Sequence, residues 1–180
     1  FTDGYKLADP EIGLTDQKKV MKNGYAIQCR ITTEDPGNDF KPDYGTLITY
    51  RNAAGFGIRL DEGSTYPGMK ISPFFDSLLV KVSTWSLSLE DAAKKMDRAL
   101  REFRIRGVKN NIQFLENIVS HPSFISGKAN VGFITNHPEL FQFVTRLDRG
   151  TRTLKFLAEV IVNGNPDVKV VNPTKTFEKA

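Results

Sequence analysis

The chain has 180 residues, 39% of them hydrophobic, which suffices for one well-packed core but not for two full domains. Its 25 basic and 21 acidic side chains give a formal net charge of +4 and are interspersed, a pattern that argues against a nucleic-acid partner. No apolar stretch in the sequence is long enough to span a bilayer, so we expect no membrane partner. The single cysteine, Cys29, cannot form an internal disulfide and is expected to be buried, in a reducing compartment.

Residues 1–23 contain turn-forming positions such as Asp9-Pro10 but few periodic apolar ones, which predicts a connector on the surface. The chain starts without an initiator methionine or a leader-like segment, so we expect a soluble fragment of a longer protein. Alternating apolar positions from Tyr25 to Ile31 predict a half-buried strand, and prolines predict a loop at 34–43. Two short strands are predicted at 47–51 and 57–60, around a turn at 53–55, and a longer, more buried strand at 78–85.

Helical periodicity begins at Leu89, where apolar residues spaced by three and four predict a helix through Phe103 with Ser88 as its N-cap. A second helix is predicted from Asn111 to Ser120, ended by His121-Pro122. Its predicted buried face consists of Ile112, Leu115 and Ile118.

A third, shorter helix is predicted near Pro138. The tail from Arg149 predicts a helix followed by a strand that closes at 163–166, and the residues after Asp167 are typical of a linker. The pattern as a whole predicts an α+β fold in which an antiparallel sheet packs with helices.

Five stretches of the sequence resemble biotin carboxylases in their order and spacing. They are GYAIQCRITTEDP (24–36), FKPDYG (40–45), GFGIRLD (55–61), SPFFDSLLVK (72–81) and EFRIRGV (102–108). The last stretch and the extension DRGTRTLKFLAEVIVNG (148–164) are similar to pyruvate carboxylases. The biotin carboxylases of acetyl-CoA and propionyl-CoA carboxylases, which share the first four stretches, are the alternative.

The resemblance implies the C-terminal lobe of an ATP-grasp biotin carboxylase. Residues 1–23 would be the connector from the ATP-grasp core and 24–145 the C-terminal subdomain. Residues 146–166 would begin the allosteric and tetramerisation region, and 167–180 would be a linker.

The chemistry implied by the resemblance is the carboxylation of biotin by carboxyphosphate, which forms from ATP and bicarbonate. The resemblance assigns catalysis to Arg59, whose guanidinium would stabilise the biotin enolate, because a fixed cation lowers the energy of a developing oxyanion. Either Asp61 or Asp76 could orient Arg59, and the sequence leaves this choice open. The residues alone favour a different interpretation, in which Arg59 is a strand-edge arginine in a surface ion pair.

A second set of arginines is implied to bind the effector acetyl-CoA through its phosphates. The set consists of Arg104, Arg106, Arg146 and Arg149. The alternative is that Arg104 and Arg106 interact with the C-terminal end of the first helix, with Gly107 as its cap.

Other features carry less weight. Lys70, in GMKI, lacks the surroundings of a biotinylated lysine. His121 and His137 each precede a proline and are expected at helix boundaries, with no third partner to complete a metal site. Gly55-Phe56-Gly57 is too short for a nucleotide loop.

The glycine-rich lid, the Glu-x-Asn segment and the Gln-Val-Glu-His segment of the ATP-grasp core do not occur in the sequence. We therefore expect ATP and Mg²⁺ to be bound mainly by the remainder of the biotin carboxylase domain, and the isolated chain to have no ligase activity. Biotin would arrive on a separate carrier domain. The parent enzyme is expected to be a tetramer, cytoplasmic or, in a eukaryote, in the mitochondrial matrix. A non-catalytic regulatory and subunit-interaction module that binds acetyl-CoA is the alternative from another class.

Overall fold

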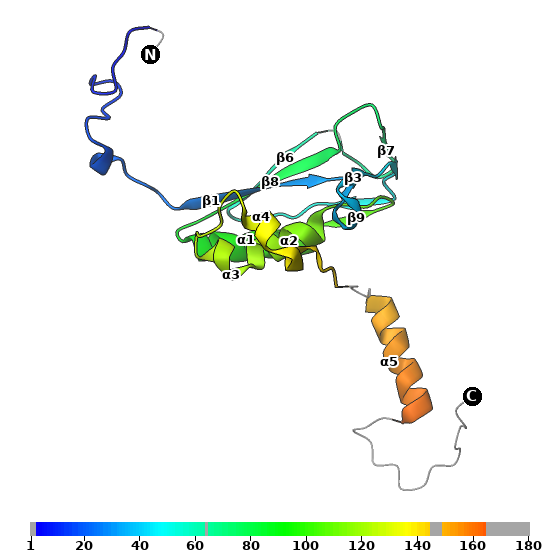
Figure 1. Cartoon of the computed structure of the whole chain (residues 1–180). Coiled ribbons are helices and arrows are strands. Elements are labelled where there is room, and N and C mark those ends of the chain that lie inside the picture. The colour runs from blue at the N-terminus through cyan, green and yellow to red at the C-terminus, as the bar shows by residue number, and fades with distance from the viewer. Residues whose placement is uncertain (1–2, 64, 145–148, 165–180) are drawn as a thin grey trace. The chain divides into compact units, whose positions relative to one another are not determined.

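The computed structural model describes residues 3–63, 65–144 and 149–164, in two compact units, residues 1–143 and 144–180. The first unit is built on a three-stranded antiparallel sheet in the order β1 (Tyr25–Thr32), β8 (Leu78–Ser86), β6 (Ile58–Glu62). Helix α1 (Leu89–Glu102) lies against one face of this sheet (Figure 1). The described residues thus confirm the predicted α+β architecture.

The core forms between α1 and the sheet face that the period-two pattern predicted. Buried side chains alternate along β1 and β8, and five residues of α1 are almost inaccessible to solvent. In the strands these residues are Ile27, Cys29, Ile31, Val80, Val82 and Thr84, and in α1 they are Ala92, Ala93, Met96, Ala99 and Leu100. The hydroxyl of Thr84 donates to the carbonyl of Ala92 at 3.1 Å, so a buried polar group is satisfied across the interface. Burial raises the pKa of the Cys29 thiol to about 12, which keeps it protonated and unreactive at neutral pH.

Three two-stranded ladders surround the central sheet. They are β2 (Glu34–Asp35) with β3 (Lys41–Pro42), β4 (Gly45–Thr46) with β7 (Lys70–Ile71), and β5 (Thr49–Arg51) with β9 (Arg104–Arg106). The predicted strand at 47–51 is wrong in its start, because Leu47 is a buried residue between β4 and β5. The 3-10 turn η2 (Pro36–Asn38) links β2 to β3. The predicted loop at 34–43 therefore contains a short ladder.

Helix α1 begins as predicted, since the Ser88 hydroxyl accepts a hydrogen bond from the Asp91 amide at 3.1 Å. Helix α2 (Ile112–Ser120) ends at His121 as predicted, but the prediction of a single buried face is wrong. Its buried residues are Ile112, Phe114, Glu116 and Val119, while Leu115 and Ile118 are half-buried. The reason is that α2 contributes to two hydrophobic clusters: Ile112 and Val119 join the main core, and Phe114 packs with Phe133 and Leu140.

Three short elements follow α2: α3 (Pro122–Ile125), α4 (Phe133–Asn136) and the 3-10 helix η3 (Pro138–Phe141). Only η3 was predicted. Before β1, residues 3–23 contain the 3-10 turn η1 (Gln17–Lys19) and are almost entirely exposed.

The second unit contains α5 (Arg149–Asn163), and the predicted change from helix to strand is wrong. Leu154, Leu157 and Ile161 recur at three and four, a spacing that suits one continuous helix, and the Gly164 amide bonds to the Val160 carbonyl at 2.9 Å. Arg146, Asp148 and the predicted linker at 167–180 lie outside the described residues. Within the described residues, no helix is long and apolar enough to cross a membrane.

Candidate active-site surface

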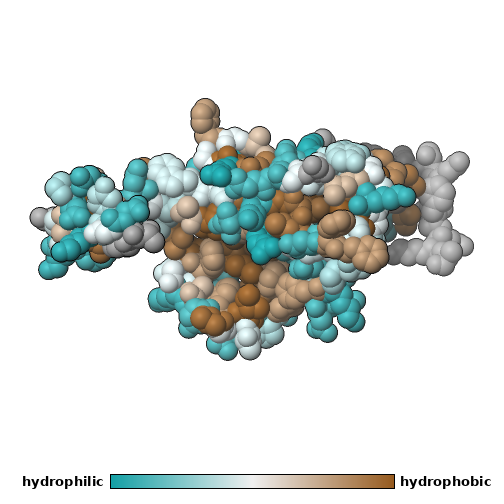
Figure 2. All heavy atoms as spheres, turned by 90° about the horizontal axis from the view of Figure 1, so that it is seen from above, coloured by the Kyte–Doolittle hydropathy of each residue, from teal (hydrophilic) through white to brown (hydrophobic). Residues whose placement is uncertain are grey.

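The polar face of the three-stranded sheet, opposite α1, holds the residues for which a catalytic role was predicted. Successive side chains of a strand point to opposite faces, so Ile58 and Leu60 pack on the core while Arg59 and Asp61 lie on the outer face. Arg59 is paired with Ser83, and Asp61 with Lys81, across the β6–β8 ladder. Seen from above, the surface carries patches of hydrophilic residues next to patches of hydrophobic residues (Figure 2).

Arg59 forms a local ion pair with Asp61. Its Nε and Nη2 atoms both donate to Oδ1 of Asp61, at 2.9 and 2.8 Å. The Arg59 side chain is 77% exposed, and β6 is an edge strand. Arg59 therefore has the geometry of a strand-edge arginine in a surface ion pair. Of the two acids predicted to orient it, Asp61 is the one that contacts Arg59.

Asp76 instead pairs with Arg30, an arginine that sequence reasoning had not singled out. The distance from Arg30 Nη2 to Asp76 Oδ2 is 3.5 Å, and Asp76 Oδ1 accepts the Leu78 amide at 3.3 Å. Arg30 is in β1 and lies across the ladder from Lys81. The ion pair therefore joins two of the stretches that resemble biotin carboxylases, 24–36 and 72–81, which lie far apart along the chain.

The backbone around Arg30 is fixed from behind by Asn111, a buried residue at the start of α2. The Asn111 amide nitrogen donates to the Arg30 carbonyl at 3.0 Å, and its oxygen accepts the Thr32 amide at 3.0 Å. Glu34 adds a second link, since its carboxylate accepts from the hydroxyls of Thr32 at 3.0 Å and Ser77 at 2.7 Å. Arg30 thus projects from a backbone held by the β1–β8 ladder and by the side chain of Asn111, an arrangement that pre-organises a side chain.

The glycines beside Arg59 serve the fold. Gly57 has φ of +72°, and a Cβ there would lie 2.6 Å from Nζ of Lys95 and 2.9 Å from the Trp85 carbonyl oxygen. Lys95 donates to that same carbonyl at 2.8 Å, and the Trp85 amide donates to the Gly57 carbonyl at 2.9 Å. The atoms that approach Gly57 closely therefore belong to α1 and β8.

The predicted effector arginines are only partly described. Nη1 of Arg104 donates to the carbonyls of Arg101 at 2.6 Å and Phe103 at 2.8 Å, so Arg104 does bind the end of α1. The cap of α1 is Phe103, and the prediction that Gly107 caps it is wrong. Arg106 is exposed in β9. Arg146 and the side chain of Arg149 lie outside the described residues.

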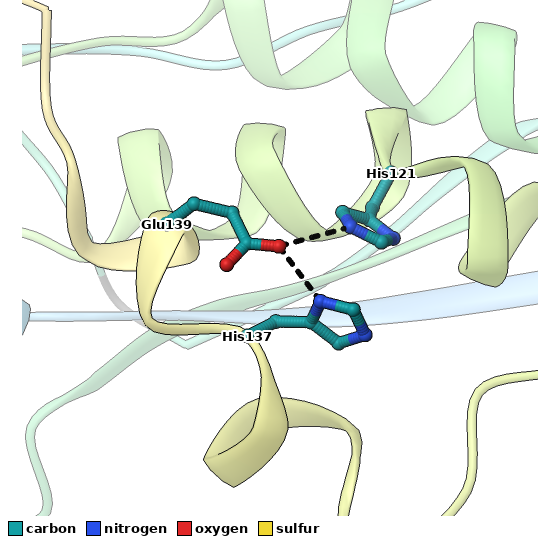
Figure 3. Close-up of side chains that lie close together, drawn as sticks. All are labelled: His121, His137 and Glu139. Carbon is teal, nitrogen blue, oxygen red and sulfur yellow. Dashed lines mark hydrogen bonds and ion pairs between the residues drawn. The ribbon is translucent and has the colours of Figure 1, made fainter.

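His121 and His137 lie at helix boundaries as predicted, but the expectation that no third partner joins them is wrong. Oε1 of Glu139 lies 2.7 Å from Nδ1 of His137 and 3.4 Å from Nε2 of His121 (Figure 3). The signal in the sequence was the spacing His137-Pro138-Glu139, which puts the carboxylate two residues from the imidazole. The pKa of Glu139 is lowered by a hydrogen bond from its own backbone amide and by those from the two histidines.

Comparison with known proteins places this geometry in a family. The family model described as the biotin carboxylase C-terminal domain matches residues 28–136. The chain belongs to the biotin carboxylase C-terminal domain family. Arg30, Arg59 and Asp76 all lie within the matched residues.

Relatives of this biotin carboxylase C-terminal domain include two bacterial pyruvate carboxylases. The chain is 53% identical to that of Staphylococcus aureus over 177 residues, and 50% identical to that of Bacillus subtilis over 165 residues. These matches cover 98% and 92% of the chain but only 15% and 14% of the relatives. The chain therefore spans about one seventh of the length of these relatives.

Solved structures agree with the sequence comparison. Pyruvate carboxylase from Rhizobium etli matches with a TM-score of 0.71 and 51% identity over 91% of this chain and 15% of its own. The biotin carboxylase domain of a thermophilic 2-oxoglutarate carboxylase matches with a TM-score of 0.67 and 38% identity over 72% of this chain and 29% of its own. The predicted resemblance to pyruvate carboxylase is confirmed.

Proposed function

We propose that this chain is part of a biotin-dependent pyruvate carboxylase, a ligase that makes oxaloacetate from pyruvate, bicarbonate and ATP, and that it completes the biotin carboxylase site. The match to pyruvate carboxylases extends beyond the family model, to 98% of the chain in the S. aureus protein. The match to the 2-oxoglutarate carboxylase domain covers 72%. This longer match supports pyruvate carboxylase over a carboxylase that shares only the biotin carboxylase domain.

The observation that carries the proposed chemistry is the Arg30–Asp76 ion pair on the polar face of the sheet. When bound, biotin supplies the ureido nitrogen that becomes carboxylated. The ion pair with Asp76 is made by Nη2 of Arg30, so Nε and Nη1 can donate to an oxygen on which negative charge develops. Donors fixed in this way contribute about 3 kcal/mol to such reactions, because they need no reorganisation at the moment of reaction.

Arg59, to which the resemblance assigned this task, is the second candidate. It keeps three of its five N–H groups after the two bonds to Asp61, so it too could reach an anionic ligand. Its partner is local, however, whereas the backbone around Arg30 is held by the side chain of Asn111 in addition to the sheet ladder. We therefore give the main role to Arg30 and a smaller one to Arg59.

The remaining components of the reaction lie outside this chain in the proposal. ATP and Mg²⁺ are bound by the remainder of the biotin carboxylase domain, and biotin is attached to a carrier domain. The parent enzyme is a homotetramer in the cytoplasm, or in the mitochondrial matrix of a eukaryote. Phe56, which is fully exposed beside the β6 edge, is suited to contact another part of that assembly.

Acetyl-CoA is the proposed effector, bound through its phosphates by Arg104, Arg106, Arg146 and Arg149. Support comes from a related R. etli pyruvate carboxylase structure, 51% identical, which is described with acetyl coenzyme A as allosteric activator. Arg106 is exposed, and Arg104 uses only Nη1 on the α1 carbonyls, so its other N–H groups are available to a phosphate.

An acceptor assay with the intact parent enzyme tests the proposed function. Purified enzyme is given ATP, Mg²⁺, bicarbonate and one acceptor: pyruvate, 2-oxoglutarate, acetyl-CoA or propionyl-CoA. We expect carboxylation of pyruvate, and a higher rate with pyruvate when acetyl-CoA is added as effector. Turnover of another acceptor in place of pyruvate would contradict the proposal.

Loss of the charge on Asp76 should reduce catalysis more than loss of the charge on Asp61. Asp76→Asn removes the charge that holds Arg30, so biotin carboxylation by the intact enzyme should fall about tenfold or more, as for other residues that position a catalytic group. Asp61→Asn removes only the partner of Arg59 and should have a smaller effect. Asp76 is exposed and Asp61 is half-buried, and each forms a surface ion pair, so thermal unfolding should be nearly unchanged in both variants. A larger loss with Asp61→Asn would favour Arg59 as the main catalytic arginine.

A further inference from the structure

The two histidines of the chain and Glu139 form a cluster on the helical side of the first unit, separate from the polar sheet face. One ligand atom from each of His121, His137 and Glu139 lies within 4.8 Å of the others. The histidines are the only two in the sequence. Two imidazole nitrogens and one carboxylate oxygen are a ligand set that divalent zinc accepts, with water in the fourth position.

The side chains are held in place by packing. The buried ring of Phe133 lies 5.1 Å from the ring of His121 and 4.9 Å from that of His137, between ring centres, and the two imidazoles are 4.3 Å apart. Glu139 reaches both imidazoles from the start of η3 (Figure 3). The side chains of His121, His137 and Glu139 are 17%, 29% and 49% exposed, so an ion from solvent can reach them.

The two separations to the Glu139 oxygen lie on either side of the value that a tetrahedral ion requires. Ligand bonds of about 2.0–2.1 Å imply about 3.3 Å between neighbouring ligand atoms. The His121–Glu139 separation of 3.4 Å already meets this value, and the His137–Glu139 separation must open from 2.7 Å. We propose that His121, His137 and Glu139 form a binding site for Zn²⁺ or a similar divalent transition metal.

Metal binding at this site is coupled to the helix boundary. Nδ1 of His121 accepts the Ser123 amide at 3.2 Å and caps α3, so a neutral ring carries its proton on Nε2, which faces Glu139. Binding of the metal to Nε2 moves that proton to Nδ1 and breaks the bond from Ser123. His137 changes tautomer in the opposite sense, from Nδ1–H to Nε2–H, and neither neutral ring loses a proton overall.

The consequence is a metal clamp between two parts of the helical layer. His121 joins α2 to α3, and His137 joins α4 to η3. Both junctions flank the cluster of Phe114, Phe133 and Leu140. The bound ion would stabilise the packing of this cluster, by an amount that grows with the logarithm of the free metal concentration once that concentration exceeds Kd.

The test is a titration of the untagged, full 180-residue chain with ZnCl₂, followed by imidazole NMR and by calorimetry. Because the sequence holds two histidines, every imidazole signal comes from this site. We expect one Zn²⁺ per chain, a change of tautomer in both rings and a shift of the Ser123 amide. His137→Ala and Glu139→Gln should each weaken binding roughly tenfold or more.

Glu90→Gln is the matched control, because Glu90 is a similarly exposed acid on α1 and should leave Zn²⁺ affinity unchanged. Circular dichroism checks that each variant is folded. Unchanged imidazole signals at saturating Zn²⁺, or equal affinity in Glu139→Gln and the native chain, would overturn the proposal. With Co²⁺ as a probe, a thiolate charge-transfer band would place the metal at Cys29 and would also overturn it. Either failure would leave the proposed carboxylase function untouched.

Discussion

Substitution of Arg30 by glutamine in the intact carboxylase is expected to reduce the rate of biotin carboxylation about 10²–10³-fold, the cost of removing one fixed donor to a developing oxyanion. Glutamine keeps hydrogen-bonding capacity but loses the charge and the forked donors. The backbone clamp by Asn111 does not involve the Arg30 side chain, so the variant should fold normally. The measurement is the initial rate of carboxylation with free biotin as acceptor.

Two further arginine variants complete this comparison. Arg98→Gln, in an exposed ion pair with Glu102 on α1, controls for the loss of any surface arginine and should leave the rate near that of the native enzyme. Arg59→Gln should lower the rate less than Arg30→Gln. If Arg59→Gln produced the larger loss, the main catalytic arginine would be the one that the sequence resemblance assigned.

The second large effect is expected from Gly107→Ala, on stability. Gly107 has φ of +103°, and a Cβ at this position would overlap the Thr46 carbonyl oxygen and lie 2.9 Å from the Ile48 amide nitrogen. Both neighbours are backbone atoms that cannot rotate away. We expect a loss of about 3 kcal/mol or more in the free energy of unfolding, measured by urea denaturation of the chain.

The loss at Gly107 has two causes, backbone strain and steric overlap, and Gly68→Ala isolates the first of them. Gly68 has φ of +93°, but a Cβ there would meet no atom within 4 Å, so only the backbone strain of about 1 kcal/mol is expected. The difference between the two variants measures the steric overlap at Gly107. Equal losses would mean that the turn at Gly107 relaxes, contrary to the packing of β9 against residues 46–48.

Local patterns in the sequence predicted the features that depend on near neighbours. Alternation predicted β1, the apolar stretch at 78–85 predicted β8, and Ser88 marked the start of α1. The same period-two rule places Arg59 and Asp61 on one face, and they pair there. The fold class and the family followed from these patterns and from the order of the five stretches.

Features that depend on distant contacts could not be predicted. The Arg30–Asp76 pair requires the register of β1 on β8, including the irregularity between Ile31 and Thr32. The pairing of β5 with β9 and the two-sided packing of α2 likewise arise only once the sheet and helices are assembled. Glu139 was missed for the same reason, since His121 and His137 meet through the packing of Phe133.

The central claim is tested most directly by measuring two rates in the Arg30→Gln enzyme, that of ATP cleavage and that of biotin carboxylation. In the proposal, carboxyphosphate forms on the remainder of the domain and Arg30 acts only on the transfer to biotin. The intact Arg30→Gln enzyme should therefore retain bicarbonate-dependent ATP cleavage near the native rate while biotin carboxylation is lost. Equal losses of both activities, or unchanged carboxylation, would contradict the assignment of Arg30 to the biotin half of the reaction.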